Sequence, residues 1–227
     1  MPSWSSSINL SMKKRLLTLY QLLLDTYGKQ HWWPGVNPFE VIVGAILTQR
    51  VAWANVEKAL FSLKEAGLME PQRLSEAPLK KIASLIRPCI YYNEKAKKLK
   101  AFLAFLEERY HGDLSSLLCL PVSSLRKELL FVRGIGQETA DSIILYAAGK
   151  PSFVVDAYTR RILNRLGLIE ERTKYAEVRV LFMENLPRDA ALYNEYHALL
   201  VCHGKKRCHN TRPLCDGCSL RAMCPFP

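Results

Sequence analysis

The sequence predicts an all-α protein. Apolar residues recur at helical spacing along most of the 227-residue chain, and no stretch shows the sustained alternation typical of a strand. Prolines fall where helices would begin or end. With 49% hydrophobic and 23% charged residues, the chain has the composition of a globular protein. Its length is enough for one large core or two small ones.

The N-terminal half reads as a series of helices. Residues 11–27 form an amphipathic pattern, and His31–Gly35 interrupts it. A proline suited to a first helical turn follows at 38. Residues 39–47 are apolar nearly all round, which predicts a buried central helix. Residues 53–66 predict the next helix.

Further helices are predicted over 78–86 and 93–110, with a proline-marked turn at Pro71 between them and the preceding helix. The lysines of the 93–110 helix predict a basic face, made of Lys95, Lys97, Lys98 and Lys100. Near the C-terminus, helices are expected at about 173–186 and 189–203.

A glycine-bracketed turn precedes a candidate catalytic acid. Gly134 and Gly136 allow a tight turn, and a helix is predicted to begin near Thr139. Backbone N–H groups at such a helix start bind anions such as phosphate. After an apolar run comes Asp156, followed by a basic helix with Arg160 and Arg161. Asp156 is therefore a candidate catalytic carboxylate, and helix capping is the alternative role.

The net charge of +11, from 32 Lys and Arg against 21 Asp and Glu, indicates a polyanionic partner, most simply nucleic acid. A merely solvated basic surface is the alternative. The absence of 18 consecutive apolar residues and of a signal-peptide pattern predicts an intracellular, cytoplasmic protein. We expect a monomer.

Four of the seven cysteines are crowded near the C-terminus, spaced C-x6-C-x2-C-x5-C. They are Cys208, Cys215, Cys218 and Cys224. Four thiolates at this spacing suit either tetrahedral zinc or a [4Fe-4S] cluster, and spacing alone does not separate the two.

The segments VRGIGQETA (132–140) and VVDAYTRRILNRLG (154–167) resemble the helix-hairpin-helix (HhH-GPD) DNA glycosylases, the superfamily of endonuclease III. The resemblance implies a six-helix barrel over 35–150 and a second helical lobe made of 1–34 and 151–227. It implies that the four cysteines hold a [4Fe-4S] cluster in the loop 208–224. The implied partner is double-stranded DNA containing damaged bases.

Upstream, FEVIVGAILTQ (39–49) and its neighbours resemble 3-methyladenine DNA glycosylase III. That resemblance implies a base pocket lined by Trp33, Pro34 and Trp53, whose rings would stack on a positively charged alkylated purine. A plain core role is the alternative for both tryptophans. Gln49 would enter the gap left by the extruded base or, alternatively, cap a helix end. Tyr91 or Tyr92 would wedge into the opposite strand.

Other DNA contacts are implied at the hairpin and in the basic segments: Gly134, Ile135, Gly136, Thr139, Arg160, Arg161 and Arg212. Endonuclease III carries a lysine where this chain has Glu138, and a carboxylate cannot form an imine with the sugar. The expected function is therefore a monofunctional glycosylase for alkylated purines, with Asp156 activating water and Glu138 near the base. The alternatives are a bifunctional glycosylase and abasic-site lyase on oxidised pyrimidines, or a non-catalytic DNA-binding module.

Overall fold

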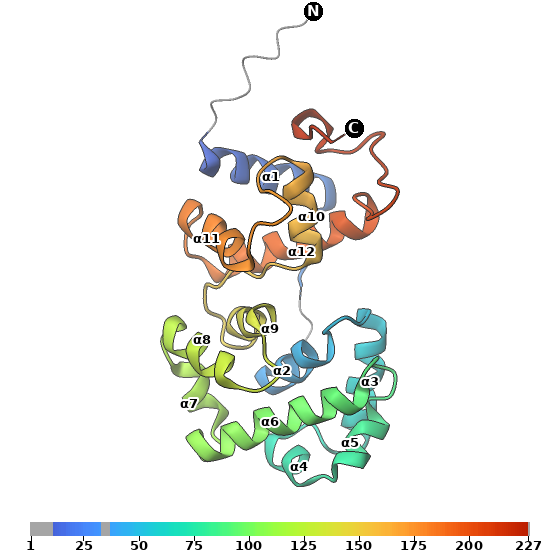
Figure 1. Cartoon of the computed structure of the whole chain (residues 1–227), viewed down its shortest axis with the longest axis vertical. Coiled ribbons are helices and arrows are strands. Elements are labelled where there is room, and N and C mark those ends of the chain that lie inside the picture. The colour runs from blue at the N-terminus through green and yellow to red at the C-terminus, as the bar shows by residue number, and fades with distance from the viewer. Residues whose placement is uncertain (1–10, 33–36, 227) are drawn as a thin grey trace, which may run out of the picture. The chain divides into compact units, whose positions relative to one another are not determined.

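A computed structural model describes residues 11–32 and 37–226. In that part of the chain every regular element is a helix, which confirms the all-α prediction (Figure 1). The chain divides into two compact units, one formed by residues 1–32 and 152–227 and the other by residues 33–151. Trp33 and Pro34, two of the residues expected in a base pocket, lie outside the described residues.

The unit 33–151 is a bundle of short helices around one long one. Its elements are α2 (Pro38–Leu47), α3 (Trp53–Glu65), α4 (Pro71–Glu76), α5 (Leu79–Leu85), α6 (Tyr92–Tyr110), α7 (Leu114–Cys119), α8 (Val122–Phe131), α9 (Gln137–Ser142) and the π-helical turn η1 (Ile143–Ala147). The segment after Pro71, expected to be only a turn, begins a helix because proline suits its first position.

Helix α2 occupies the centre of this unit. The Asn37 side chain accepts a hydrogen bond from the Glu40 N–H at 2.9 Å, and Pro38 fills the first helical turn. Every residue from Phe39 to Leu47 is buried, as the apolar pattern predicted. The helix packs against α3, α6, α9 and η1, so it joins the hairpin to the rest of the unit.

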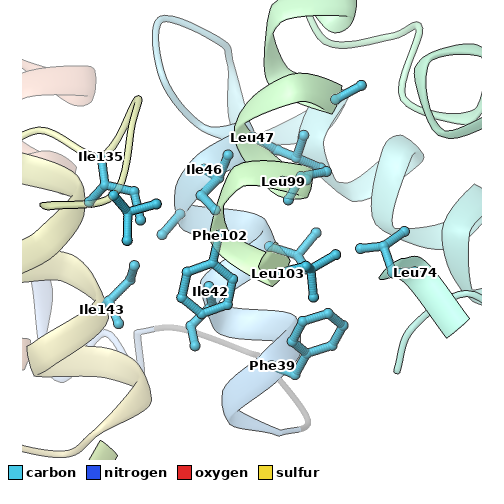
Figure 2. Close-up of a cluster of buried hydrophobic side chains, with 14 of the residues drawn as sticks. Phe39, Ile42, Ile46, Leu47, Leu74, Leu99, Phe102, Leu103, Ile135 and Ile143 are labelled. Atoms are coloured by element: carbon cyan, nitrogen blue, oxygen red, sulfur yellow. The ribbon is translucent and has the colours of Figure 1, made fainter. Parts of the chain in front are cut away.

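Figure 2 shows the resulting core, in which side chains of α2 lie between those of the hairpin and those of α6. Ile42 and Ile46 come from α2, Ile135 and Ile143 from the hairpin, and Leu103 from α6. The Ile135 side chain is 5% exposed. A residue expected among the DNA contacts therefore has its side chain in the core.

Lys95 is not part of an exposed basic face, so that element of the sequence prediction is wrong. It is 2% exposed, and its Nζ donates a hydrogen bond to the Leu47 carbonyl at 2.7 Å. Leu47 ends α2, so the ammonium satisfies a carbonyl at the negative end of a buried helix. Burial lowers the pKa of Lys95. Lys97, on the same helix, is exposed as expected.

The other unit contains α1 (Met12–Tyr27), α10 (Ala157–Arg165), α11 (Tyr175–Asn185), α12 (Ala190–Lys206) and the 3-10 turn η2 (Arg221–Met223). Helix α12 packs against both α1 and α10. At the core, the Phe153 ring stacks on Phe182 with centroids 3.6 Å apart. The edges of Tyr193 and Tyr196 meet the Phe153 ring at 5.5 and 5.8 Å.

Within the described ranges, no helix combines the length and apolar character needed to cross a membrane.

Candidate active site, hairpin and cysteine cavity

Asp156 stands at the end of a rigidly anchored extended segment. Phe153, Val154 and Val155 are buried. Arg179 donates hydrogen bonds to the Ser152 hydroxyl at 2.9 and 3.2 Å, which fixes the start of the segment. Because the aromatic core holds Phe153, the backbone reaches Asp156 with little freedom, as a precise catalytic group requires.

The two oxygens of the Asp156 carboxylate have different neighbours. Oδ1 accepts a hydrogen bond from the Thr159 N–H at 2.7 Å, so Asp156 is the N-cap of α10. Oδ2 lies 3.5 Å from His197 Nε2. Burial raises the pKa of Asp156, but His197 and the Thr159 N–H favour the charged form more strongly, and the net pKa lies below its usual value. With its side chain 14% exposed, Asp156 is an ionised carboxylate that remains partly accessible.

The helix-hairpin-helix consists of α8, a turn at residues 132–136, and α9 continued by η1. The second helix begins at Gln137, two residues before the predicted start. Gly134 has φ 92°, which favours glycine, and Gly136 caps α9 without a side chain. The first turn of this helix presents N–H groups that have no acceptor inside the helix. The Ile135 N–H donates within the turn to the Val132 carbonyl at 3.0 Å.

Gln49, two residues after the end of α2, stabilises the hairpin turn through hydrogen bonds. Its Nε2 donates to the Gly134 carbonyl at 3.1 Å and to the Thr139 hydroxyl at 3.0 Å. Lys98 Nζ donates in turn to Gln49 Oε1. The Lys98 stem also covers Gly134, where an added Cβ would come within 2.5 Å of Lys98 Cγ. Gln49 therefore positions the hairpin in this structure, and its entry into a DNA gap stays a prediction.

Gly134→Ala is expected to lower the free energy of unfolding by roughly 1–3 kcal/mol, because the methyl group overlaps Lys98 in addition to the positive-φ cost. Urea unfolding followed by circular dichroism measures the loss. Gly149→Ala is the matched control, since Gly149 also has positive φ but no atom within 4 Å of an added Cβ. In a Lys98→Ala background the Gly134→Ala penalty should shrink. Equal penalties at both glycines would show that the contact with Lys98 is unimportant.

Of the expected base-pocket residues in this unit, Trp53 begins α3 and packs, partly buried, against the core. Glu138 lies in the first turn of α9 and is exposed. An acid there is favoured by the helix dipole. Lys150, the nearest alternative amine in sequence to Asp156, donates from Nζ to the carbonyls of Leu118 and Leu120.

The arginines expected to bind phosphates have different surroundings. Arg161 donates to the carbonyls of Cys208 and Gly204 at 2.8 and 3.1 Å, which ties α10 to the C-terminal tail. Arg160 makes one hydrogen bond to the Glu171 carbonyl at 3.2 Å. Arg212 is exposed.

The four clustered cysteines line a single cavity, together with apolar side chains and Arg165. Its lining includes Cys208, Cys215, Cys218, Cys224, Ile162, Leu166, Leu214 and Leu220. Arg165 Nη1 lies 3.1 Å from Cys208 Sγ and donates to it. Burial raises the pKa of the Cys224 thiol, and the other three cysteines raise it further. Four thiols are the ligand set of a [4Fe-4S] cluster, and an apolar wall and an N–H donor to sulfur suit one, so the donor set fits. In the described residues no group of three or more His, Cys, Asp or Glu side chains is arranged to hold a single metal ion.

A histidine connects this cavity to α1. His203 is 2% exposed, its Nδ1 lies 2.9 Å from the Tyr27 hydroxyl and its Nε2 3.8 Å from Cys218 Sγ. Burial raises the pKa of Tyr27 to about 12 and lowers that of His203 to about 4. If the Tyr27 hydroxyl donates to Nδ1, the neutral imidazole carries its proton on Nε2, the nitrogen that lies nearer the Cys218 sulfur.

Sequence reasoning missed His197. It is 6% exposed on α12, far from Asp156 in the chain, and nothing in its immediate sequence marks it. The one sequence feature that could have pointed to His197 is Gly204, which lies seven positions later on the same face of α12. An added Cβ at Gly204 would lie 2.4 Å from Tyr158 Cδ1, so α10 and α12 cross closely there.

The helical fold, the hairpin and the segment bearing Asp156 define a class of protein. The family described as "HhH-GPD superfamily base excision DNA repair protein" matches residues 43–188, and the chain belongs to that family. Its class is that of the DNA glycosylases of base excision repair, as the resemblance predicted.

Among its relatives is a provisionally named DNA repair glycosylase of Methanocaldococcus jannaschii, 47% identical over 208 residues, which span 91% of this chain and 94% of the relative. Endonuclease III of Thermotoga maritima is 32% identical over 190 residues, covering 84% of each chain.

Two solved structures are similar over most of their length. An endonuclease III in a trapped covalent intermediate with DNA superposes with a TM-score of 0.82 at 25% identity, covering 94% of this chain and 95% of that one. The H. pylori 3-methyladenine DNA glycosylase bound to 1,N6-ethenoadenine gives a TM-score of 0.74 at 28% identity, covering 87% and 98%.

Proposed function

We propose that this protein hydrolyses the N-glycosidic bond of damaged bases in double-stranded DNA, with Asp156 as the catalytic carboxylate and water as the nucleophile. The observation that carries the proposal is the Asp156 site: an ionised, partly exposed acid at the start of α10, with Oδ1 hydrogen-bonded to the Thr159 N–H and Oδ2 3.5 Å from His197 Nε2. Such a group can stabilise the positive charge that develops on the sugar and can accept a proton from the attacking water. Base flipping would bring the sugar to it.

The residues favour hydrolysis without lyase chemistry. The lysine of endonuclease III is replaced by Glu138, which cannot form a Schiff base. Lys150, the lysine nearest to Asp156 in the sequence, is engaged with two backbone carbonyls of its own unit. We therefore propose a monofunctional enzyme that leaves an abasic site.

For the substrate, we propose alkylated purines of the 3-methyladenine type. A ring-alkylated purine carries positive charge and is already a good leaving group, so no strong acid is needed to protonate it. Trp33, Pro34 and Trp53 would line its pocket, with a cation–π contribution of about 0.5–2 kcal/mol. The similar H. pylori enzyme bound to 1,N6-ethenoadenine supports a purine substrate.

Binding to DNA would use the backbone of the hairpin turn together with basic side chains. Gly134, Gly136 and Thr139 would place the N–H groups of the turn against a phosphate. Arg160 and the exposed Arg212 would contact the backbone, whereas the contacts of Arg161 assign it to holding the tail. As a wedge, Tyr91 fits better than Tyr92: it is 64% exposed in a left-handed conformation with φ 58°, and Tyr92 packs on the core.

An endonuclease III-type activity on oxidised pyrimidines is the second candidate, favoured by the cysteine cavity and by the relatives with that name. An excision panel distinguishes the two. Duplexes that carry 3-methyladenine, 7-methylguanine, ethenoadenine, hypoxanthine or an oxidised pyrimidine are incubated with the enzyme and scored before and after alkaline cleavage. We expect strand breaks at alkylated purines only after alkali. Breaks at oxidised pyrimidines before alkali would overturn the proposal.

We also propose that Cys208, Cys215, Cys218 and Cys224 hold a [4Fe-4S] cluster. When bound, the cluster would supply iron–thiolate bonds that close the C-terminal tail. Arg165 would donate a hydrogen bond to the sulfur of Cys208, and His203 would present its Nε2 proton to that of Cys218.

Purified protein should contain about four iron atoms per chain and absorb broadly near ~400 nm. Cys218→Ser should lose both signals, because it removes one of the four ligands. Cys119→Ser is the matched control, since Cys119 is exposed on α7 in the other unit and should change neither. A colourless protein with one zinc ion would refute the cluster.

A further inference from the structure

His197 contacts the proposed catalytic acid from a separate helix. Its Nε2 lies 3.5 Å from Asp156 Oδ2, and the opposite carboxylate oxygen accepts from the Thr159 N–H at 2.7 Å. The carboxylate thus has one neighbour from α10 and one from α12. Only the N-cap interaction can be anticipated from local sequence.

The packing of α12 fixes the imidazole in this place. One turn before His197, the Tyr193 ring meets Phe153 edge-on at 5.5 Å. Seven residues after it, Gly204 lets Tyr158 of α10 lie against the α12 backbone. These contacts hold α12 against both the segment that leads to Asp156 and the helix that follows it. His197 is buried at 6% exposure, so solvent cannot easily replace it as a partner of the carboxylate.

Among the residues that the structure describes, His197 and Thr159 are the ones that act on the Asp156 carboxylate. From α12 there is His197, and from α10 there are the backbone N–H and the side chain of Thr159. A partly buried carboxylate with too few donors becomes protonated, and a protonated acid neither stabilises a cation nor accepts a proton from water. His197 is the one titratable residue among these partners.

We propose that His197 is a positioning residue for excision: its Nε2–H donates to Asp156 Oδ2, holds the carboxylate in one orientation and maintains it in the ionised form. No proton is transferred between them in this role. The inference rests on the proposed function, because it assigns His197 to the carboxylate that would do the chemistry.

Two substitutions separate this role from simple packing. His197→Gln keeps an N–H donor without a titratable ring, and His197→Leu removes the donor. In single-turnover excision, the Leu variant should lose rate relative to wild type at about pH 5 and be close to wild type at about pH 8, because removal of the His197 contact raises the pKa of Asp156. The Gln variant should retain most of the rate at both pH values. His111→Asn, an exposed histidine in the other unit, is the control and should match wild type. A Leu variant with the wild-type pH profile would overturn the proposal.

NMR on the DNA-free protein tests the pair independently of any activity. The ¹³C resonance of the Asp156 carboxyl should titrate at higher pH in His197→Leu than in wild type, and the ¹⁵N spectrum of wild type should place a proton on His197 Nε2. The second measurement needs no variant, so it remains decisive if the Leu protein does not fold. An unchanged Asp156 titration, or a ring protonated only on Nδ1, would refute the positioning role. If wild type excises no base while these NMR results hold, the proposed function fails and the pairing stands.

Discussion

Asp156→Asn is expected to lower single-turnover base excision by about a thousandfold, the range typical of losing a general base and a charge that stabilises the transition state. The fold should survive, because asparagine caps helices about as well as aspartate and can still accept the hydrogen bond from the Thr159 N–H. DNA binding should be kept or slightly tightened, since one negative charge is removed. Excision assays and fluorescence anisotropy on a lesion-containing duplex measure the two quantities.

Asp189→Asn is the matched control. Asp189 caps α12 in the same unit, with its Oδ1 accepting from the Leu192 N–H at 3.0 Å, and no catalytic role is assigned to it. It should excise at the wild-type rate. A non-catalytic DNA-binding module would instead show no excision with any variant, including wild type, and Asp156→Asn would then change nothing.

Arg126→Met is expected to lower the free energy of unfolding by about 3–5 kcal/mol, because it leaves the buried Asp141 carboxylate without its ion pair. Asp141 is fully buried on α9, and Arg126 of α8 binds its two oxygens at 2.9 and 3.1 Å. The pair therefore connects the two helices of the hairpin. Urea unfolding of wild type and variant gives the difference.

Arg109→Met provides the comparison within the same unit. Arg109 pairs with Glu128, but its side chain is 44% exposed and the pair is screened by solvent, so the cost should be much smaller than that of Arg126→Met. Replacing both partners, as in Arg126→Met with Asp141→Leu, should recover part of the loss because no charge is then left buried. If Arg126→Met costs no more than Arg109→Met, the buried pair does not stabilise the hairpin.

The longer helices were predictable because their periodicity alone decides them. The predicted helix 11–27 is α1, at Met12–Tyr27, and the apolar run 39–47 is α2, at Pro38–Leu47. The short helices α4 and α7 were not predicted, since six residues carry too little periodic signal and are stabilised by packing on α6.

For the candidate sites too, residues with a local sequence signal were predictable and residues that depend on distant segments were not. Asp156 and the four cysteines could be proposed from the sequence because each signal is local: an acid ahead of a helix, and sulfurs at fixed spacing. The capping role of Asp156, weighed as an alternative to catalysis, is present in the structure, and one carboxylate can serve both. Lys95 and His197 were misread or missed because their partners, Leu47 and Asp156, come from distant segments. A single sequence does not reveal such pairings.

The central claim is that water, directed by Asp156, attacks the sugar with no covalent bond between protein and DNA. Borohydride trapping during excision of an alkylated purine tests it most directly, with an endonuclease III that has the lysine as the positive control. We expect full release of the base and no protein–DNA adduct. A reduced adduct that forms in proportion to the base released would contradict the claim.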